Sequence, residues 1–156
     1  MRKMFLLSGV LLATLLMSAA HAVTCVPLKV KAQNKNLILQ GPPKDEAQVF
    51  FFKNAGQQGI WLDHPNQHAS ASAGWSSYLR SGNWSAFLLT RKNFEMSCAL
   101  IQPGKVDYQD CAKVISVCIP KAVAFKTPPK GSYWLAEDKA WDDIVKALSK
   151  RGVTLK

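Results

Sequence analysis

Short apolar runs separated by turn-forming residues make up most of the chain between residues 49 and 119. The runs are rich in β-branched and aromatic residues, and clusters of Gly, Asn or Pro separate several of them at spacings typical of antiparallel sheets. They comprise residues 49–53, 60–63, 75–79, 84–90, 94–101 and 114–119. This pattern predicts a domain built mainly from antiparallel β-strands.

Alternation of apolar and polar positions assigns faces to two of these runs. In residues 94–101 the even-numbered positions are apolar, so Cys98 is predicted to point into the core. In residues 114–119 the apolar set is 115, 117 and 119, which leaves Cys118 on the opposite face. A disulfide at either cysteine would tie its strand to a neighbouring loop or layer.

Residues 23–48 form a basic entry segment, because four lysines precede the first large aromatic residue. These are Lys29, Lys31, Lys35 and Lys44. Apolar residues alternate with lysines over residues 28–32, a pattern typical of an edge strand with its charges outward. A second apolar run, residues 37–39, is closed by Gly-Pro-Pro. We therefore expect a hairpin-like entry to the domain.

A further hairpin is expected around the Ser81-Gly82-Asn83 turn. Trp75 and Trp84 lie on either side of this turn, nine residues apart. On the two arms of a hairpin they would form a cross-strand aromatic pair, which stabilises such a structure by up to about 1 kcal/mol.

One α-helix is predicted, over residues 138–151. Its apolar stripe at helical spacing comprises Trp141, Ile144, Val145 and Leu148. Acidic residues lie in the first half and basic residues in the second, which suits the helix dipole, and Gly152 is a stop signal. Residues 153–155 are expected to form a last short strand.

Residues 1–22 have the pattern of a signal peptide. Arg2 and Lys3 precede an apolar run over 5–17, which is too short to span a bilayer, and small residues follow it up to Ala22. Cleavage there leaves one domain of 134 residues, 23–156, with 18 basic against 10 acidic residues and a net charge of +8. We expect an exported protein, periplasmic or secreted, with no transmembrane segment after cleavage.

Four cysteines remain in the exported part: Cys25, Cys98, Cys111 and Cys118. An oxidising compartment favours two structural disulfides, and four cysteines allow three pairings among which the sequence does not choose. No Cys-x-x-Cys motif is present, which argues against thiol-disulfide catalysis.

Catalytic signatures are also missing from the sequence. There is no Gly-x-Ser-x-Gly motif, and the serines beside tryptophans are expected to bond the backbone. We predict a protein that is not an enzyme, with no catalytic residues and no cofactor. A small enzyme or inhibitor acting on peptidoglycan or other glycans is an alternative.

Histidines suggest a second alternative, a metal-handling protein. Asp63, His64 and His68 carry side chains that bind zinc or copper, and the two histidines are four residues apart. Pro65 opposes the helical turn that would bring the imidazoles together, and oxidised cysteines supply no thiolate. A loop with capped turns is therefore the preferred interpretation of this segment.

Tryptophan and positive charge are the remaining candidates for binding. The relevant aromatic residues are Trp61, Trp75, Trp84 and Trp134. These tryptophans either fill the core or form a surface that binds a ligand. We favour the core, because a disulfide-stabilised β domain uses Trp to fill its interior. The basic residues are scattered and do not form a nucleic-acid motif, which favours an ordinary solvated surface. The partners expected of an exported basic protein are an unidentified protein or an anionic glycan or envelope polymer, and not nucleic acid.

A group of short motifs extends over most of the chain from Val49 to its end. It comprises residues 61–65, 71–79, 82–87 and 93–98, the spacing of Cys111 and Cys118, and residues 133–137 and 151–153. In these motifs the chain resembles the EnhB-type enhanced-entry proteins of Legionella and related bacteria. The resemblance implies an exported factor that takes part in entry into host cells, and it carries no catalytic residue over to this chain.

Taken together, the patterns predict a mainly β protein, an antiparallel β-sandwich with one C-terminal α-helix and stabilising disulfides. The predicted function is that of an exported, non-enzymatic binding or accessory factor.

Overall fold

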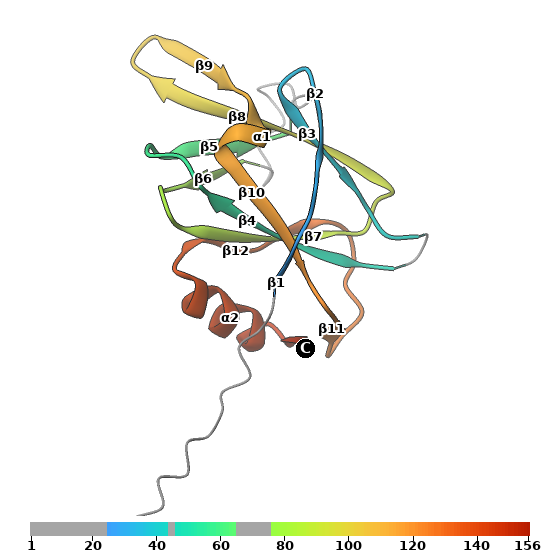
Figure 1. The fold of residues 1–156 in the computed structure, drawn as a ribbon. Helices are drawn as coiled ribbons and strands as arrows, with labels where there is room; N and C mark the ends of the chain where they lie inside the picture. Colours follow the sequence, from blue (N-terminus) through green and yellow to red (C-terminus); the bar gives the residue numbers. More distant parts are fainter. Residues whose placement is uncertain (1–24, 44–45, 65–75) are drawn as a thin grey trace, which may run out of the picture.

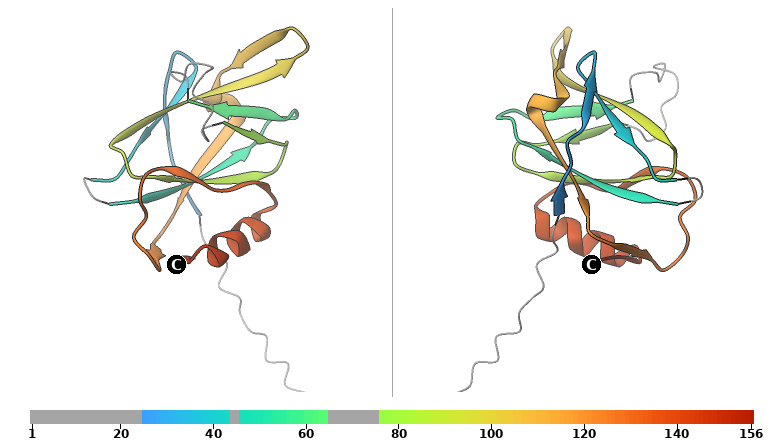
Figure 2. Two further views of the ribbon diagram at one scale, coloured as in Figure 1. Left: turned by 180° about the vertical axis from the view of Figure 1, so that it is seen from behind. Right: turned by 45° about the vertical axis from the view of Figure 1, so that its right-hand side comes forward.

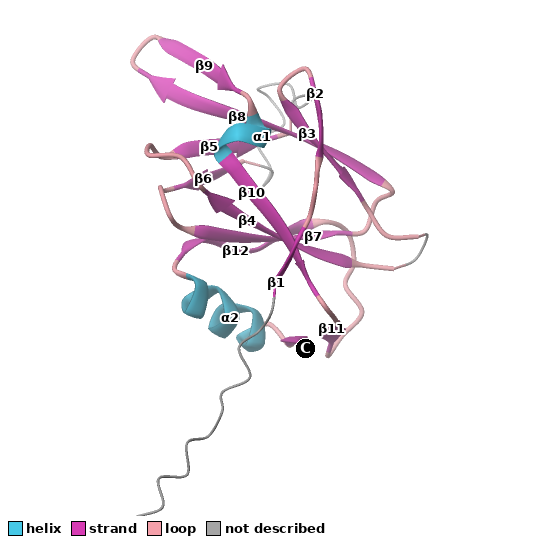
Figure 3. Cartoon of the chain, in the orientation of Figure 1, coloured by secondary structure: helices cyan, strands magenta, loops and turns pink. Residues whose placement is uncertain are grey.

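Strands account for most of the regular structure in the computed structural model, which describes residues 25–43, 46–64 and 76–156 (Figures 1 and 3). The predicted signal peptide, Lys44, His68 and Trp75 lie outside the described residues. Within the described residues the strands are β1 (Cys25–Pro27), β2 (Lys31–Gln33), β3 (Asn36–Gln40), β4 (Gln48–Asn54), β5 (Ile60–Asp63), β6 (Ser77–Leu79), β7 (Trp84–Leu89), β8 (Asn93–Gln102), β9 (Lys105–Gln109), β10 (Ile115–Pro120), β11 (Val123–Phe125), β12 (Tyr133–Lys139) and β13 (Val153–Leu155). The helices are α1 (Cys111–Val114) and α2 (Trp141–Lys150).

Two antiparallel sheets form the sandwich that the sequence predicted. One has five strands in the order β1-β10-β4-β7-β12. The other has six, in the order β2-β3-β8-β5-β6, with β9 paired to the outer part of β8. Every strand pair is antiparallel. The fold class predicted from the alternating pattern is therefore confirmed, and so is the hairpin-like entry, which consists of β2 and β3.

Strand β4 lies at the centre of the molecule and is buried on both faces. Phe50 and Phe52 point into the core between the two sheets, while Val49 and Phe51 point to the other side of the five-stranded sheet. This explains the uninterrupted apolar run, because a strand covered on both faces needs no polar side chains.

Helix α2 and the two-stranded sheet of β11 and β13 cover that other side (Figure 2). Ile144 and Leu148 of α2 are fully buried, and the Trp141 ring contacts Phe51 with ring centroids 5.0 Å apart. The molecule therefore has three layers: the six-stranded sheet, the five-stranded sheet, and the helix with its small sheet.

The predicted helix begins three residues too early. Residues 138 and 139 belong to β12, which pairs with β7, and Asp138 has a φ of 48° that no α-helix contains. The helix therefore runs from Trp141 to Lys150, and Gly152 follows in the left-handed conformation with a φ of 74°. The acidic pair in its first turn is Asp142 and Asp143. A second helix, the single turn α1, was not predicted.

The hairpin predicted around residues 81–83 is wrong. Strand β6 pairs with β5 in the six-stranded sheet, whereas β7 pairs with β4 and β12 in the five-stranded sheet. The turn therefore crosses from one layer of the sandwich to the other. Alternation within a run cannot distinguish these two connections, because both leave every second side chain in the core.

Two disulfides resolve the pairing that the sequence left open. Cys25 is bonded to Cys118, and Cys98 is bonded to Cys111. Cys98 lies in the core between the sheets and Cys118 in the core under α2, so both predicted orientations are confirmed. The first bond fixes edge strand β1 to β10, and the second fixes β8 to α1.

Candidate functional site

The tryptophans lie in three different environments. Trp134 is buried between the two sheets, and its ring contacts those of Phe52 and Phe87. Trp84 packs against Trp141 of α2 with ring centroids 4.7 Å apart. Trp61 is half-buried on β5, on the opposite face of its strand from the core. Trp84 is half-buried as well, but its ring packs on α2, whereas Trp61 lies on the outer face of the six-stranded sheet and is the better placed of the two to contact a partner.

The register of the six-stranded sheet puts Trp61 in a row across four strands. Tyr78 of β6 is opposite Trp61, Trp61 is opposite Ala99 of β8, and Ala99 is opposite Tyr108 of β9. Opposed residues project from the same face of a sheet, and here that face is turned away from the core. The rings of Trp61 and Tyr78 are in contact, with centroids 5.3 Å apart.

The outer ends of β8 and β9 extend this row. Ile101 and Val106 are opposite each other, and each lies two residues from the row, so both share its face. In Figure 1 the β8–β9 hairpin projects from the body of the sandwich. We call the five residues Trp61, Tyr78, Ile101, Val106 and Tyr108 the aromatic face.

Large apolar side chains on the aromatic face are strongly exposed. The exposed fractions are 58% for Ile101, 57% for Tyr108, 51% for Val106 and 42% for Tyr78. Among the described residues, the other exposed large hydrophobic side chains are Val26 and Tyr133, at 41% and 39%, on strands of the five-stranded sheet. Isolated exposed apolar residues are normal, whereas contiguous exposed apolar patches are common at interaction sites, which makes the aromatic face a candidate.

A covalent and a polar contact hold the base of the hairpin. Cys98 of β8 is bonded to Cys111, which follows β9 by two residues. The backbone N–H of Cys111 donates to the carbonyl of Lys35 at 2.9 Å, and the Lys35 ammonium donates to the carbonyl of Tyr108 at 3.2 Å. These contacts attach the hairpin to the β2–β3 turn, so a partner would meet a pre-organised surface.

Carboxylates at the border of the aromatic face already have partners. Glu95 accepts a hydrogen bond from the Asn36 side chain at 2.8 Å, and Asp63 accepts one from the backbone N–H of His64 at 2.7 Å. An apolar centre bordered by polar groups that are already hydrogen-bonded is the arrangement found in protein interfaces.

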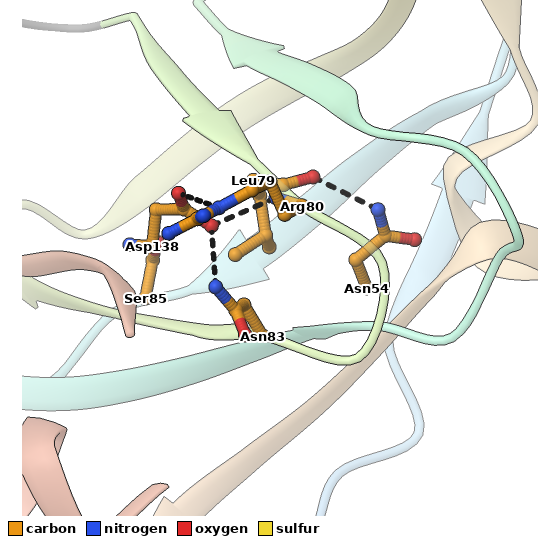
Figure 4. Close-up of polar contacts among 6 residues, drawn as sticks. All are labelled: Asn54, Leu79, Arg80, Asn83, Ser85 and Asp138. Carbon is orange, nitrogen blue, oxygen red and sulfur yellow. Dashed lines mark hydrogen bonds and ion pairs between the residues drawn. The ribbon is translucent and has the colours of Figure 1, made fainter. Parts of the chain in front are cut away.

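The densest polar cluster surrounds Asp138, where the β6–β7 turn meets β12 (Figure 4). The Asp138 carboxylate accepts hydrogen bonds from the backbone and the guanidinium of Arg80, at 2.9 and 2.6 Å, and from the Asn83 side chain at 2.8 Å. Its own backbone N–H donates to the Ser85 hydroxyl at 3.0 Å. The cluster fixes the crossing turn to the edge of the five-stranded sheet.

Asp138 is ionised more readily than a free aspartate. Partial burial acts to raise its pKa, but the hydrogen bonds from the Arg80 backbone, Asn83 and the Arg80 guanidinium outweigh it and hold the pKa below the usual 3.8. A carboxylate held in its ionised form accepts these hydrogen bonds more strongly, so the cluster is suited to stabilising the turn.

The proposed metal ligands are only partly within the described residues. His64 packs edge-on against Phe94, with ring centroids 4.8 Å apart, and His68 is outside the described part of the chain. Across residues 25–43, 46–64 and 76–156, no group of three or more His, Cys, Asp or Glu side chains could hold a metal ion.

Sequence reasoning identified Trp61 but missed the rest of the aromatic face. Residues 105–109 alternate Lys, Val, Asp, Tyr and Gln, which is a strand pattern, and Gly104 before them is a turn signal. Recognising β9 would have placed Val106 and Tyr108 together on one face. Aligning them with Trp61 requires the register between distant strands, which the sequence does not give.

Comparisons with protein-family models, with curated proteins and with solved structures find no match to this chain. Neither helix in the described part of the chain is long and apolar enough to cross a membrane.

Proposed function

We propose that this chain is an exported, non-enzymatic binding protein that recognises a protein partner on the host-cell surface through the aromatic face. The observation that carries the proposal is the gathering of four strongly exposed apolar side chains, together with Trp61, on the outside of one sheet. Most apolar residues of the other sheet are covered by α2 and by the six-stranded sheet, and its two exposed large apolar residues, Val26 and Tyr133, lie on its two opposite edge strands.

A protein is the partner best suited to this face. Protein interfaces are enriched in Tyr and Trp, and their centres are apolar with polar groups around the rim. Here the exposed rings and aliphatic side chains lie together, and Glu95 and Asp63 lie at the border with their own hydrogen-bond partners. The resemblance to enhanced-entry proteins supports a partner on a host cell.

Export has separate support in the sequence and in the disulfides. The basic start and apolar run of residues 1–22 have the pattern of a signal peptide, and all four cysteines are oxidised in pairs. Disulfides of this kind persist in the periplasm or outside the cell.

Binding to cultured phagocytic cells tests the proposal. The oxidised protein, purified after export from an expression host and fluorescently labelled, is titrated on intact cells by flow cytometry. We expect saturable binding that protease treatment of the cells removes. The double variant Ile101→Ser/Tyr108→Ser should bind at least tenfold more weakly, because central apolar residues of an interface contribute the most to its affinity.

The matched control is Val26→Ser/Tyr133→Ser, which removes two exposed apolar side chains from the five-stranded sheet. It should bind like the wild type. Equal binding by the Ile101/Tyr108 variant would contradict the proposal. So would binding that survives protease but is lost when cell-surface glycans are removed, or a wild-type dimer in sedimentation that the Ile101/Tyr108 variant abolishes.

A further inference from the structure

Strand β9 has a free edge. It pairs with β8 along one side, and no strand within residues 25–43, 46–64 and 76–156 pairs with its other side (Figure 1). Its pairing with β8 is regular, from Lys105 opposite Gln102 to Gln109 opposite Cys98, and the strand contains no proline. β9 therefore lacks the bulge and the proline with which many edge strands avoid pairing with another chain.

The other edge strands of the two large sheets are shorter or irregular. β1, β2 and β6 have three residues each. β12 has two register shifts and contains Asp138 with its positive φ. Since β9 has five residues in regular pairing, it is the edge in the described part of the chain that is best suited to accept a further strand.

The hairpin connection determines which backbone groups of β9 face outward. Lys105 lies opposite Gln102 across a two-residue turn, and the pair that closes such a turn is hydrogen-bonded. Bonded and non-bonded pairs alternate along an antiparallel ladder. Asp107 therefore bonds to β8, whereas Val106 and Tyr108 direct their N–H and C=O groups away from β8.

One contact supports this assignment. The carbonyl of Tyr108 accepts a hydrogen bond from the exposed Lys35 ammonium at 3.2 Å, so it points away from β8. The N–H of Tyr108 and both backbone groups of Val106 make no hydrogen bond within the described residues. An exposed ammonium exchanges a carbonyl for water at little net cost, so Lys35 does not block this edge.

A strand added to β9 would enlarge the aromatic face. Directly opposed residues of antiparallel strands project from the same face of a sheet. The residues opposite Val106 and Tyr108 would therefore place their side chains beside these two exposed side chains, and their backbones would bond to β9. The residue between them would lie opposite Asp107, on the other face.

Charge favours a foreign segment over a second copy of this chain. In the symmetric pairing of two β9 strands that uses both Val106 and Tyr108, each Asp107 would lie opposite the same residue of the other copy, and like charges in that position are destabilising. The Asp107 carboxylate accepts one hydrogen bond, from the Gln109 side chain, and has further acceptor positions. A basic residue opposite Asp107 and an acidic residue opposite Lys105 are complementary to β9.

We propose that the partner is recognised by strand addition, in which one of its extended segments pairs antiparallel with β9. Apolar residues of the segment lie opposite Tyr108 and Val106, and a basic residue between them lies opposite Asp107. This inference rests on the proposed function, because it specifies how the aromatic face engages a protein partner.

A synthetic peptide tests strand addition without the cellular partner. The probe is acetyl-Ser-Thr-Val-Lys-Val-Glu-Ser-amide, whose two valines are designed to lie opposite Tyr108 and Val106. It is titrated into the isotopically labelled, oxidised protein up to about 2 mM, a concentration that detects millimolar dissociation constants. We expect saturable changes in the NMR spectrum and slower hydrogen exchange at the amides of Val106 and Tyr108. Absence of both changes would overturn the proposal.

Two methylated forms of the probe distinguish strand pairing from apolar contact alone. N-methylation of both valines removes the N–H groups that face β9 and should weaken binding at least tenfold, because two hydrogen bonds are lost. N-methylation of the lysine and the glutamate alters the edge that faces away from β9, and the affinity should stay within about threefold of that of the probe. Equal effects of the two modifications would contradict strand addition.

Variants of the protein make the same comparison from the other side. Val106→Pro removes an outward N–H without removing a bond to β8, and proline is tolerated where a strand N–H faces solvent. Val106→Ala keeps the N–H and loses more apolar surface. We expect Val106→Pro to bind the probe at least tenfold more weakly than the wild type, and Val106→Ala only about threefold more weakly. Continued protection of the Asp107 amide verifies that the β8–β9 pairing is intact.

Equal losses in Val106→Pro and Val106→Ala would overturn strand addition, and so would a wild-type dimer in sedimentation that Val106→Pro abolishes. Binding of the same two variants to phagocytic cells separates this inference from the proposed function. If the wild type binds the cells and the two variants bind them equally well, strand addition fails while the proposed function stands. If the wild type binds the probe but not the cells, the proposed function fails while strand addition at β9 stands.

Discussion

The disulfide between Cys25 and Cys118 joins residues 93 positions apart and attaches the three-residue edge strand β1 to β10. Replacing both cysteines with alanine removes this cross-link. Cys25 is only half-buried at the edge of the sheet, whereas Cys118 is buried under α2, so a smaller packing loss adds to the loss of the cross-link. The main effect of the replacement should be to raise the conformational entropy of the unfolded chain, which lowers the free energy of unfolding.

The size of the effect follows from the length of the closed loop. In the chain-entropy account of disulfides, a loop of this length stabilises the folded state by about 4.7 kcal/mol at 25 °C. The shorter loop of Cys98–Cys111, with a separation of 13, corresponds to about 3 kcal/mol. Since small domains are stable by about 5–15 kcal/mol, loss of the longer cross-link removes about a third or more of the stability.

Urea unfolding at 25 °C measures this loss directly. Cys25→Ala/Cys118→Ala should have a free energy of unfolding about 4–5 kcal/mol below that of the wild type. The amide of Leu28, which donates to Val117 beside the β1–β10 pair, should exchange its hydrogen faster in the variant. A loss below about 2 kcal/mol would show that the closed loop does not restrict the unfolded chain to the extent that its length implies.

Two further predictions concern single side chains. The pKa of Asp138 is lowered in the folded protein, so the ionised carboxylate stabilises the fold. This stabilisation is complete at pH values above the usual pKa of aspartate, and it is lost as the pH falls through the lowered pKa. Asp138→Asn should therefore cost about 1.5–3 kcal/mol at pH 7, and its deficit relative to the wild type should shrink below about pH 4. A deficit independent of pH between 2 and 7 in urea unfolding would argue against the role of the carboxylate. In thermal unfolding, Trp134→Ala should lower the free energy of unfolding by about 3–5 kcal/mol, because the ring fills the core between the sheets. Trp61→Ala should lower it by only about 1 kcal/mol, because that ring lies on the outer face of its sheet. Equal losses would contradict the assignment of Trp134 to the core and Trp61 to the surface.

Apolar runs and their alternation with polar residues predicted most of the strands correctly. The run over residues 94–101 alternates so clearly that its face and the direction of Cys98 were both correct. The strands from β4 to β10 begin and end within two residues of the predicted runs where these exist. The exceptions have physical causes. Strand β12 contains Glu137 and Asp138, and the helix was predicted to begin at Asp138 because acidic residues are common in the first turn of a helix. The register shifts of β12 also interrupt the regular alternation of a strand.

Information about distant pairing was not accessible from the sequence. The crossing of residues 81–83 between the sheets, the choice of disulfide partners and the alignment of Trp61 with Tyr108 all depend on the order of strands in the sandwich. The same holds for the approach of Gly41 to the β7–β8 turn, about 50 residues later in the chain, where its N–H donates to the carbonyl of Lys92. None of these contacts leaves a periodic signal.

The most direct test of the central claim is the affinity of Ile101→Ser/Tyr108→Ser for intact phagocytic cells, relative to that of Val26→Ser/Tyr133→Ser. Both variants lose two exposed apolar side chains, and only the first loses them from the aromatic face. Binding through the aromatic face predicts that the first binds at least tenfold more weakly than the wild type while the second binds as tightly as the wild type. Equal affinities for the two variants would contradict it.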